Sequence, residues 1–200
     1  MNASYVLIGS LLAPSIHFDR MGAMALVYLL AVGVSAHSLD AMAPNKPWGA
    51  FLSRRQLLAL ASAGLVLSLG IGLYYALAYA PLLLPLGVLE LFFLLAYNLE
   101  LFGGRFHTDL WFAISWGFLP VLAGFLVQTN TINLTAAGGG LFGFFTAFVE
   151  INASRPYKAL KKAPRGEYSP LAGKFESILK GVVASVLAVA AFMLAVRILG

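Results

Sequence analysis

Cysteine is absent from the 200-residue chain, and charged residues make up only 10% of it. The first absence excludes disulfide bonds and thiolate chemistry. The second separates the chain from ordinary soluble domains, in which about 25% of residues are charged. Hydrophobic residues account for 60% of the sequence, which is more apolar surface than a soluble fold of this size can bury. The composition therefore indicates a membrane protein, and we expect no nucleic-acid partner.

Seven apolar stretches follow one another, with no strand-like alternation long enough to predict a barrel. A transmembrane helix needs about 20 apolar residues, and six of the stretches meet that requirement. The first is short and contains Pro14, so it suits a tilted span or a re-entrant segment, whereas no Lys or Arg precedes it as in a signal peptide. We predict an all-α bundle of about seven transmembrane helices, in a single domain over residues 1–200, around a lipid-accessible cavity that opens to the cytoplasm. The stretches are approximately Ala3–His17, Met21–Leu39, Leu57–Tyr79, Pro81–Asn98, Asp109–Val127, Asn133–Val149 and Ser177–Val196.

The basic residues divide unequally between the two sides of such a bundle. If all seven stretches cross, one side receives the N-terminus and the segments 40–56, 99–108 and 150–176. Arg20 and Arg197 are the basic residues of the opposite side. Because Lys and Arg collect in cytoplasmic loops, we predict a cytoplasmic N-terminus and a basic cytoplasmic loop at about 150–176. The basic residues of the cytoplasmic side are Lys46, Arg54, Arg55, Arg105, Arg155, Lys158, Lys161, Lys162, Arg165 and Lys174.

Small residues recur at helical spacing in two of the stretches. Small side chains let helix backbones approach closely, so we expect these positions to pack against neighbouring helices and assign them no chemistry. They are Gly64, Ser68 and Gly72 in the third stretch, and Gly138, Gly139, Gly140 and Gly143 in the sixth.

Two acidic positions stand out within or beside the apolar stretches. His37 and Asp40 are three residues apart, so a continuing helix places them on one face. Their side chains suit a binding site for a cation or a polar head group. The alternative is a helix end whose polar residues meet water. Glu90 lies near the middle of the fourth stretch, where an ionisable residue is costly and is a functional candidate. Its alternative role is a hydrogen bond that joins two helices.

Two further polar segments fall on the predicted cytoplasmic side. The turn after Tyr97 and Asn98 contains His107, and it is either part of a loose metal-ligand set or a capped hydrophilic turn. The segment after Glu150 contains five cations within eleven residues, which attract acidic lipid head groups or an anionic substrate. Positive-inside topology alone also explains them. These cations are Arg155, Lys158, Lys161, Lys162 and Arg165.

The layout resembles the UbiA superfamily of intramembrane prenyltransferases over roughly residues 1–150. That family carries an Asn-Asp-x-x-Asp segment after its second helix and a second Asp-rich segment after its sixth. Here the first motif resembles residues 36–40, Ala-His-Ser-Leu-Asp, followed by Lys46-Pro47. The run from Tyr97 through residues 116–120, Trp-Gly-Phe-Leu-Pro, to Gly124 resembles the family's fourth and fifth helices. Ala36 and His37 stand where the family has Asn and Asp, and the second motif reduces to Glu150.

The resemblance implies transfer of an isoprenoid group from a prenyl diphosphate to a lipophilic acceptor within the membrane. It implies Asp40 and Glu150 as Mg²⁺ ligands, with His37 on the diphosphate and Tyr97 near the departing phosphate. The alternative is a non-catalytic relative, a membrane subunit or lipid-binding protein with protein partners, that has lost the metal site. A small transporter in which Glu90 relays a proton is a third interpretation. The remaining residues implied to contact the diphosphate are Arg54, Arg55, Asn98, Arg155 and Lys158.

Overall fold

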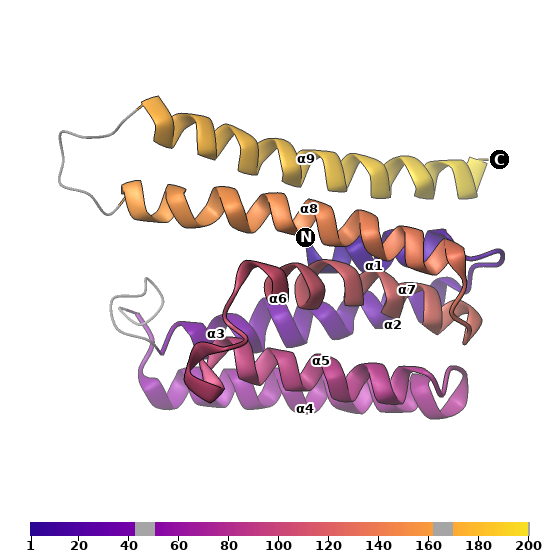
Figure 1. The fold of residues 1–200 in the computed structure, drawn as a ribbon. Coiled ribbons are helices and arrows are strands. Elements are labelled where there is room, and N and C mark those ends of the chain that lie inside the picture. The colour runs from indigo at the N-terminus through magenta and orange to yellow at the C-terminus, as the bar shows by residue number, and fades with distance from the viewer. Residues whose placement is uncertain (43–50, 162–169, 200) are drawn as a thin grey trace.

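The computed structural model describes residues 1–42, 51–161 and 170–199 (Figure 1). Over these ranges the chain is helical, with short turns and no strand. The expected residues Lys46, Pro47, Lys162 and Arg165 lie outside the described ranges. The helices in chain order are α1 (Asn2–Leu11), α2 (Phe18–Tyr28), η1 (Leu29–Ala36), α3 (His37–Asp40), α4 (Arg54–Ala78), α5 (Leu83–Asn98), η3 (Leu101–Gly104), α6 (Asp109–Ala113), η4 (Ile114–Phe118), α7 (Leu119–Thr129), α8 (Leu134–Lys161) and α9 (Pro170–Leu199).

Five helices in the described ranges are long and apolar enough to cross a membrane, which confirms an all-helical chain of membrane type. They are Phe18–Asp40, Arg54–Ala78, Asp109–Thr129, Leu134–Lys161 and Pro170–Leu199. The first and third are continuous rods in which the π-helical turns η1 and η4 join α-helical pieces. The five spans account for five of the seven predicted stretches.

The other two stretches form shorter helices. α1 has 10 residues, about 15 Å at 1.5 Å per residue, which is half of a hydrocarbon core about 30 Å thick. It ends before Pro14, in agreement with the expected short segment. α5 has 16 residues and begins just after Pro81, with Pro85 in its first turn. Proline is tolerated there because the first N–H groups of a helix have no intrahelical partner.

The predicted basic loop is largely helical. Residues 150–161 continue α8 beyond the apolar stretch, and residues 170–176 form the start of α9. α8 therefore carries its basic residues on a helical end that lies beside the start of α9, as Figure 1 shows.

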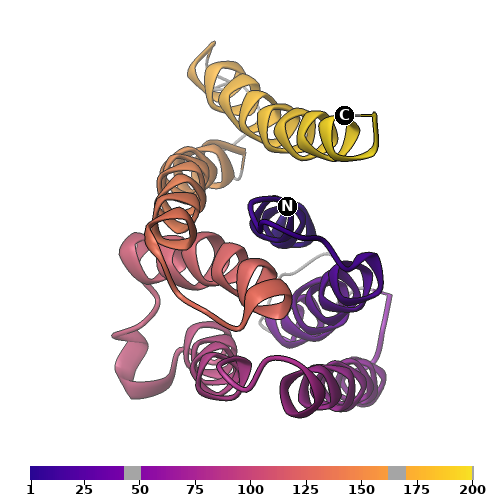
Figure 2. The same cartoon turned by 90° about the vertical axis from the view of Figure 1, so that its right-hand side faces the viewer.

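The rod α6–η4–α7 lies at the centre of the bundle, and α1 packs along its second half (Figure 2). All residues of α7 from Leu119 to Gln128 are buried. A Cβ atom added to Gly124 would lie 2.1 Å from the carbonyl oxygen of Val6, and one added to Gly9 would lie 2.0 Å from that of Val121. The two backbones thus touch at paired glycines, as in tightly packed membrane helices.

Side chains from α7 and α9 satisfy backbone groups at the C-terminal end of α1 and in the turn that follows it. The Arg197 guanidinium from α9 donates to the carbonyl oxygens of Leu11, at 3.1 Å, and Ala13, at 2.6 Å. The Gln128 side chain both accepts from and donates to the backbone of His17, at 2.7 and 3.2 Å. Arg20 lies over the Tyr79 ring, 4.2 Å from its centroid. The two cations expected on this side therefore both have structural partners.

Replacing Gly124 with Ala should destabilise the fold by about 1–3 kcal/mol, because the backbones of α1 and α7 must separate to admit a methyl group. Thermal unfolding in detergent, followed by circular dichroism, measures the effect. Gly138→Ala is the matched control, since a Cβ atom there meets no atom within 4 Å. Equal unfolding temperatures for the two variants would contradict the close approach.

Candidate functional site

The predicted polar residues gather at one end of the bundle. α3, the first turn of α4, the turn η3, the start of α6 and the polar end of α8 all lie there (Figure 1). This end is opposite the one stabilised by Arg197 and Gln128. The sequence therefore placed these segments correctly relative to one another, and the contacts within the end determine which side chains meet.

Tyr97 forms the inner wall of this end. Its side chain is buried, and its ring stacks on the His107 ring with 4.3 Å between centroids. The Nδ1 atom of His107 lies 3.0 Å from the Tyr97 carbonyl oxygen. Both residues thus hold the end of α5 against the start of α6, and His107 is engaged with the backbone of α5.

The chain reverses direction sharply between these two residues. Glu100, Phe102, Gly103 and Gly104 all have left-handed backbone conformations, with φ between 49° and 75°. Glycine adopts this conformation without a steric penalty, whereas Glu and Phe adopt it at a cost. The turn brings Phe106 against Phe92, with 5.0 Å between ring centroids, which offsets part of that cost.

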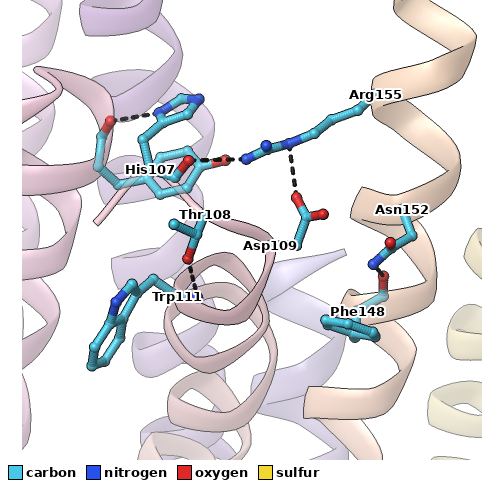
Figure 3. A network of polar contacts seen from close by, with 8 residues as sticks. His107, Thr108, Asp109, Trp111, Phe148, Asn152 and Arg155 are labelled. Atoms are coloured by element: carbon cyan, nitrogen blue, oxygen red, sulfur yellow. Dashed lines mark hydrogen bonds and ion pairs between the residues drawn. The ribbon is translucent and has the colours of Figure 1, made fainter. Parts of the chain in front are cut away.

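Arg155 joins α8 to this turn, as Figure 3 shows. Its Nε atom forms an ion pair with Oδ1 of Asp109 at 2.8 Å, and its Nη2 atom donates to the His107 carbonyl oxygen at 3.1 Å. The Tyr97 hydroxyl group lies within hydrogen-bonding reach of the same guanidinium. Arg155 was expected to contact a diphosphate, and the structure gives it three protein partners instead.

The other residues that were expected to contact the diphosphate lie at the same polar end of the bundle. Arg54 and Arg55 are exposed in the first turn of α4, and Lys158 is exposed on α8. His37 is exposed, and its Nδ1 atom lies 2.7 Å from the Val32 carbonyl oxygen. Asn98 instead donates to the Leu94 carbonyl oxygen of its own helix, at 2.7 Å. The cationic side chains are therefore accessible from outside the protein, whereas the Asn98 side chain is engaged in a hydrogen bond within α5.

Asp40 and Glu150, the two implied metal ligands, have different surroundings. Asp40 is exposed at the end of α3 and lies within electrostatic range of Tyr97. Glu150 lies within electrostatic range of the N-terminal amino group and of Tyr5 in α1. The described part of the chain contains no group of three or more His, Asp or Glu side chains placed to hold a metal ion.

Mg²⁺ prefers octahedral oxygen ligation, and metal sites for phosphate substrates are built from carboxylates and the phosphates themselves. A buried cluster of acids would fit that chemistry. The described residues do not form one, because no three of their His, Asp or Glu side chains are placed to hold an ion, and Asp109 pairs with Arg155. The arrangement therefore does not fit the two-metal centre of the resembled family, and no chemical step is assigned to a metal here.

A cavity of about 240 Å³ lies between α2, η1, α4 and α5. Apolar side chains line nearly all of it, including Leu83 near one end of α5 and Leu94 near the other. Along a helix these two residues are about 16 Å apart. Trp116 of η4 lines the cavity and packs with Leu94 and Tyr97 in one buried cluster. The cavity is thus elongated, and its inner end lies directly beneath the polar end.

Glu90 and Tyr28 are the ionisable groups of this cavity, and the Tyr28 hydroxyl donates a hydrogen bond to Oε1 of Glu90. The sequence singled out Glu90 but not its partner, because 62 residues separate them. It predicted a lipid-accessible cavity but not the residues that line it, and it missed both π-helical turns. Such turns are frequent at functional sites, but no residue pattern in η1 or η4 distinguishes them from α-helix.

Comparison with known proteins adds no relative: no protein-family model, no curated protein and no solved structure matches the chain.

Arg155→Ala should lower the free energy of unfolding by at least about 1 kcal/mol, because a partly exposed ion pair is lost together with the contacts to the His107 carbonyl oxygen and the Tyr97 hydroxyl group. For a chain of this size that corresponds to about 2–4 °C in the thermal midpoint. Thermal unfolding in detergent measures the shift. The control is Lys158→Ala on the same exposed helical end, for which no change is expected. An Arg155→Ala protein with the same thermal midpoint as the wild type would show that the network does not hold α8 against the turn.

Proposed function

We propose that the chain is a UbiA-like membrane protein that binds an isoprenoid amphiphile without the family's metal centre. The anionic head group of the ligand lies at the basic end of the bundle, and its hydrocarbon chain lies in the cavity between α2, α4 and α5. This corresponds to a lipid-binding protein or membrane subunit rather than to a prenyltransferase.

The elongated cavity carries this proposal. Ligand sites are concave and mostly apolar, with a few polar groups that fix orientation. The cavity has that character, and its inner end at Leu94 is one helical turn from Tyr97. A chain that fills it therefore brings its head group to the end where Arg54 and Arg55 are exposed. Lys and Arg beside a membrane attract anionic groups by about 1 kcal/mol each.

A Mg²⁺-dependent prenyltransferase is the second candidate, and one observation favours it. Asp40, the surviving acid of the resembled motif, lies at the mouth of the same end and within electrostatic range of Tyr97. In that function Asp40 would hold the metal ion together with phosphate oxygens and Glu150, and the metal would assist departure of the diphosphate. The lack of a carboxylate cluster in the described ranges favours the binding function over this one.

Binding of a non-hydrolysable prenyl diphosphate analogue to the purified protein separates the two functions. The lipid-binding proposal predicts that binding persists in a metal chelator and in Asp40→Ala. It also predicts at least a tenfold loss in a variant with both Arg54 and Arg55 replaced by Ala, since two head-group contacts are lost. Binding that requires both Mg²⁺ and Asp40 would instead support the prenyltransferase. No binding by a folded, monodisperse sample would contradict both.

A cavity-filling variant tests where the chain lies. Gly72 lines the cavity, and a Cβ atom there meets no atom within 4 Å, so Leu can occupy the space without displacing a neighbour. Gly72→Leu should therefore abolish binding of the analogue while leaving the fold intact. Gly70→Leu is the matched control, because Gly70 is also free of neighbours within 4 Å but lies outside the cavity. Equal binding by the two variants would place the chain elsewhere.

For the orientation we propose that the basic end is cytoplasmic, that α5 crosses the bilayer together with the five long spans, and that α1 lies within the bilayer as a half-length helix. The basic end of α8 supports this, since positive residues collect on the cytoplasmic side.

The absence of cysteine makes orientation directly measurable. A single cysteine in place of Lys161 should react with a membrane-impermeant maleimide from the cytoplasmic face, and one in place of Ile132 should react from the opposite face. Both positions are exposed. Labelling of intact cells and of inside-out vesicles gives the two accessibilities. The reverse pattern would overturn the orientation, and reaction of both cysteines from one face would overturn the odd number of crossings between them.

A further inference from the structure

We infer that Glu90 is the hydrogen-bond acceptor for the hydroxyl group of a neutral, lipid-soluble ligand that reaches the cavity from the bilayer between α4 and α5. The inference rests on the cavity of the proposed function and assigns it a second ligand class, which would occupy the cavity in place of the anionic amphiphile. The class is an apolar molecule with one hydroxyl group, such as an isoprenoid alcohol.

The position of Glu90 is the first observation. Glu90 is seven residues from the start of α5 and eight from its end, which is about 10 Å or more from either end. A carboxyl group at that depth is costly in a membrane and marks a ligand site or an internal contact. Tyr28 donates to Oε1 of this carboxyl group. Within the described ranges no residue donates to its second oxygen, and the side chain lines the cavity. One acceptor atom is therefore available to a ligand.

The surroundings of Glu90 indicate the ligand's charge. Among the described residues, those that line the cavity include no second carboxyl group and no cationic side chain. The Ser68 hydroxyl group, which also lines it, donates to the Leu65 carbonyl oxygen. An ammonium group would have to lose its hydration with a single acceptor as compensation, which is far more costly than burial of a neutral hydroxyl group. An anionic group would be repelled by the carboxylate form. A neutral hydroxyl group can donate the hydrogen bond that the second carboxyl oxygen of Glu90 lacks, and it loses little hydration in doing so.

The route follows from the lining residues of α4 and α5. Val88 on α5 and Leu73 on α4 line the cavity yet are 71% and 51% exposed. Exposed lining residues on both helices mean that the cavity opens on the outer surface between them. That surface faces lipid if α4 and α5 span the bilayer. Gly72 and Gly87 lie on the two sides of this opening, and neither has an atom within 4 Å of an added Cβ. Glycine on both helices leaves the passage wide.

The size of the cavity limits what it encloses. Pockets that enclose small ligands measure about 300–1,000 Å³, whereas this one measures about 240 Å³. The cavity therefore encloses part of a ligand, and the rest of the molecule extends through the opening into the bilayer. A chain-like alcohol satisfies this condition better than a compact, fully enclosed molecule.

The test compares farnesol with farnesyl methyl ether, which has the same chain and no hydroxyl donor. Wild-type protein in nanodiscs should bind farnesol at least about tenfold more tightly, the effect expected of one hydrogen bond to a carboxyl group. Glu90→Leu should bind the two ligands equally and retain its affinity for the ether, which also shows that the variant is folded. Glu90→Gln keeps an acceptor oxygen in a side chain of the same size and should keep part of the preference.

Other outcomes overturn the inference in distinguishable ways. Equal affinity of wild-type protein for alcohol and ether would mean that Glu90 and Tyr28 only join two helices, and the cavity would remain a chain-binding site. Tighter binding of farnesylamine than of farnesol would overturn the neutral donor. Binding of both ligands that is unaffected by Gly72→Leu would place them outside the cavity and overturn the inference, whereas the proposed function is tested separately by the prenyl diphosphate analogue.

Discussion

The contact between α1 and α7 is the constraint on which the rest of the structure depends. Inside a bilayer every backbone polar group needs an internal partner, and a helix of 10 residues is too short to cross the hydrocarbon core. The paired glycines at 9 and 124 bring α1 directly onto the central rod. The Arg197 guanidinium then satisfies the carbonyl groups that α1 leaves free. α9 is consequently held to the bundle by a polar interaction as well as by apolar contacts.

The two ends of the bundle use polar residues differently. At one end Arg197, Gln128 and Arg20 are all engaged with the protein, so that end is a closed structural layer. At the other end Arg155 ties α8 to α6, while Arg54 and its neighbour remain exposed. The cavity extends toward the second end. Bound head groups and a bound chain would therefore share one face of the molecule, with lipid access from the side and aqueous access from the end.

The fold was largely readable from the sequence, and the site was not. Long apolar runs with few charges determine helices by their length alone, and the predicted stretch Pro81–Asn98 contains α5 (Leu83–Asn98). Packing required contacts between distant segments: Gly72 was expected to pack closely but lines a cavity. Local pattern also failed for Leu134–Lys161, whose polar end continues as helix beyond the membrane-like stretch. The partnership of Tyr28 with Glu90 was hidden because no spacing rule connects different helices.

The π-helical run η1 has a consequence for His37 and Asp40. In an α-helix each residue turns the chain by about 100°, whereas a π-helical turn holds more residues and each residue turns the chain less. The direction in which His37 and Asp40 point around the rod therefore depends on the wider winding of Leu29–Ala36. If the same residues wound as a regular α-helix, both polar side chains would face a different side of the rod. The backbone of η1, which lies within the apolar part of the rod, thus helps to set the direction of polar groups at its end.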